Sequence, residues 1–259
     1  MASVCTAFGG RRVIAATLVA ASLLGFGGRA EASPASWVKQ ALANTLGHDG
    51  RTPAAPPVAR YVIDEGGVFI LDRSSRRPLL KFDDSPEVWV LSPSRGPRGD
   101  IIYKNDLGEP LLRATKLGGM TVFTPRRPEG SAAALIGPST PLRLSTIGPV
   151  ALLRDLAQAS FRSSRAAQHL IEFEAPDTSA ANDGLIADAA IVAMEAVVTL
   201  SSRPGGKAAL ARIGKIALIG GDKPAAKLRG GVLTITVVPP QGLGGRPSSM
   251  RILQAAMVR

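Results

Sequence analysis

The sequence is poor in the residues on which most metal sites and thiol enzymes depend. Its 259 residues include one cysteine and two histidines, and aromatic residues make up 4%. A single cysteine cannot close a disulfide within the chain, and so few cysteines and histidines make a zinc site or a Cys/His mechanism hard to build. We therefore expect no metal and no cofactor. The shortage of aromatic residues also argues against nucleic-acid binding, which combines basic residues with aromatic stacking.

Basic and apolar residues, by contrast, are plentiful. Lysine and arginine total 31 against 20 acidic residues, for a formal net charge of +11, and 45% of residues are hydrophobic. The apolar content is enough for a sizeable core, and 28 glycines with 20 prolines indicate many turns rather than low complexity. The basic excess favours an anionic partner, although net charge alone reports on solubility as much as on binding.

The first 32 residues have the features of a secretory signal peptide. Arg11 and Arg12 precede an apolar run, residues 13–26, and the small-residue site Ala30-Glu31-Ala32 follows. A run of this length is too short to span a bilayer. We expect cleavage near Ala32, a periplasmic or secreted product, and no membrane span in the remainder. The paired arginines leave twin-arginine export open beside ordinary secretion. Cleavage would lower the net charge from +11 to +9.

The remaining pattern predicts an α+β protein. Residues 33–57 are expected to form a short helix and a Gly/Pro-rich linker, residues 58–128 a β-rich domain, residues 129–141 a linker, and residues 142–259 an α+β domain. Short apolar runs between turn residues predict an antiparallel meander, sandwich- or barrel-like, in the β-rich domain. Its seven expected strands cover residues 61–63, 68–71, 79–82, 87–91, 101–104, 111–115 and 120–124.

A possible internal repeat appears when the β-rich domain is shifted by 32 residues. Gly67 then falls on Gly99, and the run Pro78-Leu79-Leu80 falls on Pro110-Leu111-Leu112. Two copies of a three-stranded unit would explain the match. Chance similarity between short strands joined by proline-rich turns is the alternative.

The α+β domain is expected to hold two to three helices and a small sheet. Residues 149–167 form an amphipathic pattern with Leu153, Leu156 and Phe161 facing inward. Further helices are expected at 183–200 and 204–213. Strands are expected at 169–174, 215–219, 232–238 and 251–258. The strand pattern at 169–174 turns His169 toward the core, away from any catalytic role.

Charges in the predicted turns alternate in sign, which suggests two candidate sites. Successive turns of a meander lie at opposite ends of the sheet, so one end would be acidic and the other basic. Arg126 and Arg127 do not follow this alternation. They lie in the loop after the last predicted strand, at the acidic end, and either neutralise that end or turn away from it. The basic end supplies the candidate anion-binding residues Arg73, Arg76, Arg77, Arg95, Arg98 and Lys116. The acidic turn Asp83, Asp84 and Glu87 supplies weak catalytic candidates, although ordinary solvated turn residues are the favoured explanation.

Three stretches carry a resemblance to a known family. They are Pro78-Leu79-Leu80-Lys81-Phe82-Asp83-Asp84-Ser85-Pro86-Glu87-Val88-Trp89, the run from Gly99 to Asp106, and the run from Leu117 to Phe123. They resemble a domain-of-unknown-function family of exported proteobacterial proteins, most strongly over residues 60–128. The resemblance implies export and brings no activity, fold or site residue with it.

These observations favour an exported, non-catalytic binding protein. The expected partner is an anionic envelope polymer, a lipid headgroup or an acidic protein, because the basic surface is polarised and no competent catalytic set is present. The alternative is a hydrolase that acts on envelope material through Asp83, Asp84 and Glu87. A structural role in a larger assembly is a third possibility, and the sequence does not fix the oligomeric state.

Overall fold

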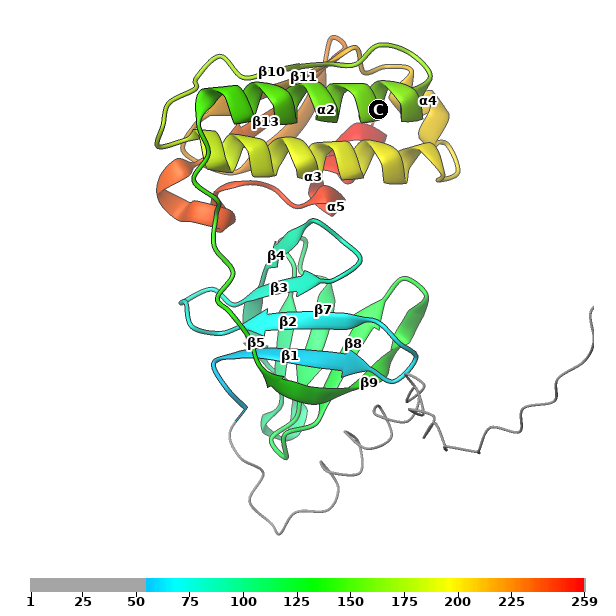
Figure 1. Cartoon of the computed structure of the whole chain (residues 1–259). Helices are drawn as coiled ribbons and strands as arrows, with labels where there is room; N and C mark the ends of the chain where they lie inside the picture. Colours follow the sequence, from blue (N-terminus) through cyan, green and yellow to red (C-terminus); the bar gives the residue numbers. More distant parts are fainter. Residues whose placement is uncertain (1–54, 259) are drawn as a thin grey trace, which may run out of the picture.

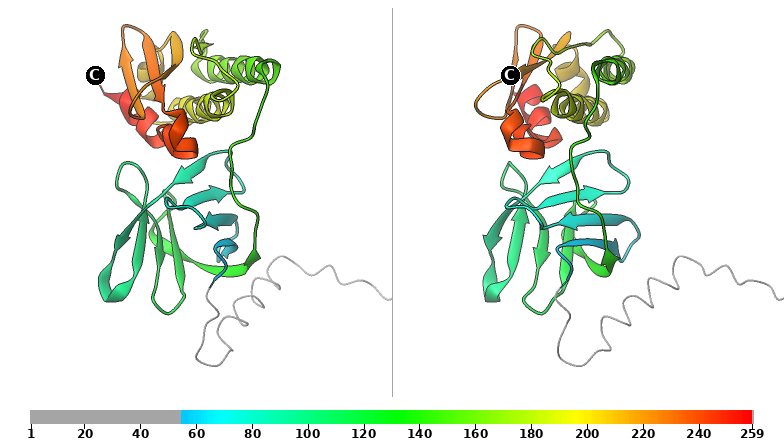
Figure 2. Two further views of the ribbon diagram at one scale, coloured as in Figure 1. Left: turned by 90° about the vertical axis from the view of Figure 1, so that its left-hand side faces the viewer. Right: turned by 60° about the vertical axis from the view of Figure 1, so that its left-hand side comes forward.

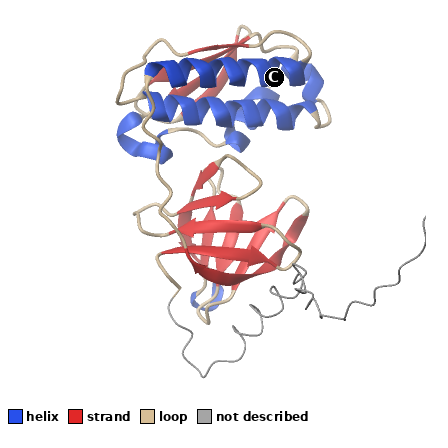
Figure 3. Ribbon diagram, in the orientation of Figure 1, coloured by secondary structure: helices blue, strands red, loops and turns tan. Residues whose placement is uncertain are grey.

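The computed structural model describes residues 55–258, which form a barrel-like β-sheet and a C-terminal α/β unit (Figure 1). Strands dominate the first unit and helices cover the second (Figure 3). The expected α+β class is confirmed in outline. The predicted signal peptide and nearly all of the predicted helix and linker at 33–57 lie outside the described residues.

Nine strands make up the first sheet, and every neighbouring pair is antiparallel. They are β1 (Val58–Ile63), β2 (Val68–Asp72), β3 (Leu79–Phe82), β4 (Val88–Val90), β5 (Ser92–Arg95), β6 (Ile101–Lys104), β7 (Pro110–Ala114), β8 (Met120–Thr124) and β9 (Arg127–Pro138). The order is β4-β3-β2-β1-β9-β8-β7-β6-β5. The two edge strands, β4 and β5, are consecutive in the chain and separated only by Leu91, so the chain itself connects the two edges. The sheet is therefore nearly a closed barrel.

Strand β9 occupies most of the segment that the sequence analysis treated as the linker 129–141. Its glycines, prolines and alanines are typical of a loop, yet it pairs with β1 on one side and β8 on the other. Pairing on both sides outweighs weak local propensity. Gly130 also has a specific role there, because a Cβ at this position would lie 2.5 Å from the Thr121 side chain. Strand β5 was likewise predicted as part of a turn.

The two stretches related by the 32-residue shift pair in equivalent register. Leu71 lies opposite Leu80, and 32 residues later Tyr103 lies opposite Leu112. The next pairings, β3 with β4 and β7 with β8, differ by one position. Gly67 and Gly99, which also coincide in the shift, both have positive φ, a conformation that glycine adopts at little cost.

The barrel core is built from alternate side chains of its strands. Phe69, Leu71, Leu80, Leu112 and Val122 are fully buried. The rings of Tyr61 and Phe69 stack with centroids 5.1 Å apart. Alternation along short strands therefore gives this unit an apolar core of its own.

The C-terminal unit is a small sheet with helices packed on it (Figure 2). Its four strands run in the order β10-β11-β13-β12, with β12 antiparallel and the others parallel. The elements are α2 (Pro149–Ala167), β10 (Glu172–Glu174), α3 (Asp183–Ser201), α4 (Gly206–Leu210), β11 (Lys215–Gly220), β12 (Ala225–Arg229), β13 (Val232–Val237), the 3-10 segment η2 (Pro239–Gly245) and α5 (Ser249–Met257). Helices α2, α3 and α4 and strands β11 and β13 confirm the sequence predictions to within a few residues, whereas β12 was not predicted.

Three predictions for this unit are wrong. The segment 251–258, expected as a strand, belongs to helix α5, where Ser248 caps the first turn and Ile252, Leu253 and Ala256 form the buried face. A short apolar run does not distinguish the two structures by periodicity. His169 precedes β10 and is exposed rather than core-facing; its ring nitrogens lie 3.1 Å from the Ala167 carbonyl and 2.8 Å from the Ile213 carbonyl.

The third error concerns the orientation of α2. The helix buries Leu152, Leu156 and Ala159, while Leu153 and Phe161, expected inside, are each 67% exposed. The sequence pattern identified an apolar face correctly but assigned part of it to the wrong side.

Helix α3 is long and apolar enough to cross a membrane by length and composition alone. Of its most apolar window, 61% is buried inside the protein. It packs against α2 and contributes many of the buried residues of the C-terminal core. Such burial is typical of a central core helix.

Candidate functional site

The barrel and the C-terminal unit meet where β4 faces the segment 239–251. Leu79 and Val88 of the barrel form a small apolar cluster with Leu243 of η2. Around this cluster, carboxylates of the barrel bind the start of α5. The two units are therefore joined by a mixed apolar and charged interface.

Arg246 is the central residue of this interface. Its side chain is only 2% exposed and forms an ion pair with Asp188 of α3. It also lies 3.6 Å from the Glu87 carboxylate and donates to the Val88 carbonyl at 2.9 Å. One guanidinium thus connects α3 with the start of β4, and a buried charge of this kind requires its partners.

Two barrel carboxylates accept hydrogen bonds from the first turn of α5. Glu87 accepts from the Ser249 amide at 3.0 Å and from its hydroxyl at 2.5 Å. Asp106, in the turn between β6 and β7, accepts from the Ser248 amide at 3.2 Å and pairs with Arg251 at 2.7 Å. A helix N-terminus has amides without intrahelical partners and favours negative charge, so both carboxylates complement it.

Burial dominates the ionisation of Glu87. It raises the pKa of this carboxyl above the ordinary value of 4.5, although Arg246 and the hydrogen bonds from Ser249 act in the opposite direction. At Asp72, burial also acts to raise the pKa, but hydrogen bonds from Ser74 and from the Leu142 amide outweigh it, so that the pKa is lowered. Asp72 thereby fastens the chain between the two units to the barrel, through a 2.8 Å bond to Leu142.

A cleft of about 610 Å³ opens beside this interface, between the barrel and the C-terminal unit. Five cationic side chains line it against a single carboxylate, that of Asp106. Arg246 and Arg251 are engaged in the ion pairs given above. Among the described residues, no anionic side chain pairs with the other three, Arg77, Lys104 and Lys223. The half-exposed ring of Trp89 lies in the same wall. We call this space the interdomain cleft.

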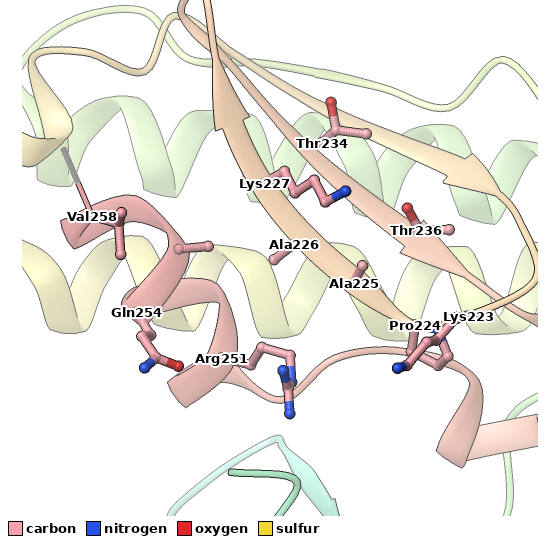
Figure 4. A pocket seen from close by; sticks show the side chains of 11 residues that line it. Lys223, Pro224, Ala225, Ala226, Lys227, Thr234, Thr236, Arg251, Gln254 and Val258 are labelled. Atoms are coloured by element: carbon pink, nitrogen blue, oxygen red, sulfur yellow. The ribbon is translucent and has the colours of Figure 1, made fainter.

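A second hollow of about 630 Å³ adjoins the interdomain cleft, because Lys223, Pro224 and Arg251 line both. It lies between α5 and strands β12 and β13 (Figure 4). Lys227, Thr234 and Thr236 contribute a further cation and two hydroxyl groups. Together the hollows offer a basic path that begins at the barrel and follows α5.

The predicted basic residues do not form one site. Arg77 lines the interdomain cleft, whereas Arg73 donates to the carbonyls of Ala55 at 3.0 Å and Pro56 at 2.8 Å. The others are exposed and line neither hollow: Arg76, Arg95, Arg98 and Lys116.

The predicted acidic residues are also separated. Asp83 is exposed and forms an ion pair with Arg60, Asp84 is exposed, and Glu87 is buried against α5. At the same end of the barrel, Arg127 pairs with Glu65 at 2.6 Å, so the exit arginine neutralises an acidic turn. Within residues 55–258, no three Asp, Glu, His or Cys side chains lie close enough together to hold a metal ion.

Sequence reasoning missed most of the cleft. Lys104 was assigned to a strand, Lys223 to a connection and Arg251 to a strand, so none had a reason to be grouped with Arg77. Arg77 is the one predicted binding residue that lines the cleft. The rest of the lining combines barrel residues such as Trp89 with residues of the C-terminal unit such as Lys223 and Arg251, and their approach depends on how the two units dock.

Residues 41–256 match the family described as Domain of unknown function (DUF4908). This chain belongs to that family. No curated protein and no solved structure matches it. The DUF4908 match covers the barrel, the C-terminal unit and every residue of the interdomain cleft, a longer stretch than the residues 60–128 on which the sequence resemblance was strongest.

Proposed function

We propose that this DUF4908 protein is exported and binds an anionic component of the cell envelope in the interdomain cleft, without catalysing a reaction. The observation that carries the proposal is a set of three cations around one cleft, Arg77, Lys104 and Lys223, which pair with no anionic side chain of residues 55–258. Ligand sites occur preferentially at domain interfaces and measure about 300–1,000 Å³. The cleft has this position and this size.

The chemistry of the lining favours an acidic sugar or a sugar phosphate at the end of a polymer. Arginine and lysine bind carboxylate and phosphate groups. Trp89 offers an apolar ring against which a flat or cyclic group can pack. The adjoining hollow, with Lys227 and two threonines, extends the space for a longer anionic ligand.

The hydrolase alternative has weaker support. It requires Asp83, Asp84 and Glu87 to act on one substrate, but Glu87 is buried and hydrogen-bonded to Ser249, whereas Asp84 is exposed. A general acid and its partner carboxylate must both reach the substrate. We therefore retain binding as the proposed function.

Binding is tested with the fluorescence of Trp89. The chain has two tryptophans, so the substitution Trp37→Phe leaves Trp89 as the only one. The full-length gene product in this background is purified and titrated with glucuronate and glucose 6-phosphate, with glucose as the neutral control. We expect the two anions, and not glucose, to change the emission, with affinity that falls as salt increases.

A matched pair of charge variants decides where the ligand binds. The triple change Arg77→Gln, Lys104→Gln and Lys223→Gln should abolish the emission change. The control removes three cations that line neither hollow, through Arg95→Gln, Arg98→Gln and Lys116→Gln, and should bind as before. Equal loss in both variants, or no response to either anion, refutes the proposed site.

Export is tested separately. The full chain carrying a C-terminal tag is expressed in a bacterial host, the cells are fractionated, and the N-terminus of the recovered protein is sequenced. We expect a periplasmic or secreted product that begins at Ser33. An uncleaved cytoplasmic product would contradict the export part of the proposal.

A further inference from the structure

Helix α2 carries an apolar stripe on its outer surface. Val150 is 83% exposed, and Leu153 and Phe161 are each 67% exposed. Together with the exposed Ala157 they are spaced by three, four and four residues, which places them on one face of a helix. Leu170, just beyond the end of the helix, is 65% exposed. The stripe itself runs from Val150 to Phe161.

This stripe does not contribute to the core. Helix α2 faces α3 with its other side, where Leu152, Leu156, Ala159 and Ser163 are buried. It forms an outer layer of the C-terminal unit, away from the barrel (Figure 2). Isolated exposed apolar residues are ordinary, but a contiguous row of them marks an interaction surface.

Arginines accompany the stripe on one side only. At 100° per residue, Arg154 and Arg165 lie on one side of the stripe, with Arg162 further round, whereas Ser160 lies on the opposite side. Arg154 pairs with the adjacent Asp155 at 3.1 Å and is 73% exposed. Such exposed pairs are weak and exchange readily. Within residues 55–258, Arg165 makes no ion pair.

We propose that the outer face of α2 docks onto an anionic phospholipid surface. An apolar stripe on one face and basic residues at its border are the features of a helix that lies in the plane of a membrane interface. Leu153 and Phe161 would enter the boundary between headgroups and acyl chains, while the arginines would contact lipid phosphates. This surface is separate from the interdomain cleft, so the proposal does not rest on the proposed function.

The distribution of charge favours a lipid surface over a second copy of the chain. Two α2 helices packed antiparallel about a two-fold axis would place the same side of both helices together, and the arginines of one copy would approach those of the other. Like charges that meet in this way repel each other. A sheet of anionic headgroups is complementary to them instead.

The test is sedimentation of the full-length gene product with vesicles of phosphatidylcholine alone or mixed with phosphatidylglycerol. We expect binding to the mixed vesicles at low salt and little to the neutral ones. The double variant Leu153→Gln and Phe161→Gln should weaken binding at least about tenfold, because it removes two apolar side chains from the interface. Arg154→Gln with Arg165→Gln should weaken binding to the mixed vesicles only.

Two controls make the result specific. Leu117→Gln removes another exposed apolar side chain, 86% exposed, from the barrel, and should leave binding unchanged. The double change Arg95→Gln and Arg98→Gln, which removes two exposed cations of the barrel, should also leave it unchanged. Equal binding to neutral vesicles, no binding to the mixed ones, or wild-type binding by the Leu153/Phe161 variant overturns the proposal. So does a concentration-dependent dimer in lipid-free solution that this variant dissociates.

Discussion

Ser249, the first residue of helix α5, donates its hydroxyl to the carboxylate of Glu87 on the barrel, 162 residues earlier, at 2.5 Å. With Asp106 bound to Ser248 in the same turn, the first turn of α5 is bound by carboxylates from another unit. The helix N-terminus therefore contributes to docking, and the geometry of the interdomain cleft depends on it. Substitutions that weaken this interface should therefore also change the interdomain cleft, which residues of both units line.

Removing the charge of Arg246 should destabilise the protein strongly. Arg246→Met leaves Asp188 and Glu87 buried or half-buried without their cation, and loss of one partner from a buried ion pair costs about 3–5 kcal/mol. Urea denaturation of the variant and the wild type measures the difference in their free energies of unfolding. Arg229→Met, at an exposed arginine of β12, is the control and should change it by less than about 0.5 kcal/mol. A small effect at Arg246 would show that the guanidinium is not essential to docking.

Replacing Glu87 by glutamine should make the stability of the protein depend less on pH. Because burial raises the pKa of Glu87 above 4.5, the folded state binds this proton more tightly than the unfolded state does, and stability falls as pH rises from 4.5 through the raised value. Glu87→Gln removes this fall in stability, because glutamine does not ionise. Its amide oxygen can still accept a hydrogen bond from Ser249. The melting temperature of the variant relative to that of the wild type should therefore increase as pH rises from 4.5 to 7.

The effect of pH on stability should have the opposite sign at Asp100, where the pKa is lowered rather than raised. A hydrogen bond from Arg113 lowers the pKa of Asp100, so its stabilising effect is present at neutral pH and is lost as pH falls through the lowered value. Asp100→Asn should therefore lower the melting temperature at pH 7 and have less effect in acid. If both variants responded to pH in the same direction, the assignment of one of these shifts would be wrong.

Equivalent leucines in the two stretches related by the 32-residue shift should be equally important. Leu80 and Leu112 are both fully buried, and they lie opposite Leu71 and Tyr103 at matching positions. Leu80→Ala and Leu112→Ala should each cost about 2–5 kcal/mol of unfolding free energy. Leu117→Ala, at an exposed turn position, is the reference. A large cost at only one of the two sites would show that the two stretches contribute unequally to the core.

Local sequence patterns were sufficient for most of the barrel. Strands such as β2 and β3 are short apolar runs between clear turn residues, and this combination predicts them. Strand β9 has no such pattern, and its structure comes from partners on both sides. The strand prediction for the segment 251–258 was wrong for another reason, because a short apolar run is compatible with both a helix and a strand. Only the cap at Ser248 and the burial of Ile252 show that the segment is helical.

Local sequence patterns could not predict the candidate site, because residues of both units line it. Arg77 was among the predicted binding residues because of its turn, but Lys104 was predicted within a strand, and Lys223 and Arg251 lie far away in the sequence. Glu87 was considered for catalysis because carboxylates cluster in its turn, and its burial by α5 could not be read from that turn. The apolar residues of α2 were recognised, yet an amphipathic pattern does not state which apolar residues face the protein.

The cap of α5 should be energetically coupled to the barrel. The Ser248 hydroxyl accepts from the Arg251 amide at 3.1 Å and donates to Asp106 at 2.5 Å. Ser248→Ala should cost about 0.5–2 kcal/mol, as loss of a cap does. Asp106→Asn should cost a comparable amount, because it loses the charge that pairs with Arg251.

A double-mutant cycle measures the coupling between Ser248 and Asp106. Residues in contact share interaction energies of about 0.5–3 kcal/mol, so the double variant should lose less stability than the sum of the two single variants. Ser145→Ala, at an exposed serine of the segment between the units, should be additive with Asp106→Asn and serves as the control. If Ser248→Ala were also additive with Asp106→Asn, the cap would act within α5 alone, and the docking of the two units would rest on Arg246 and Glu87.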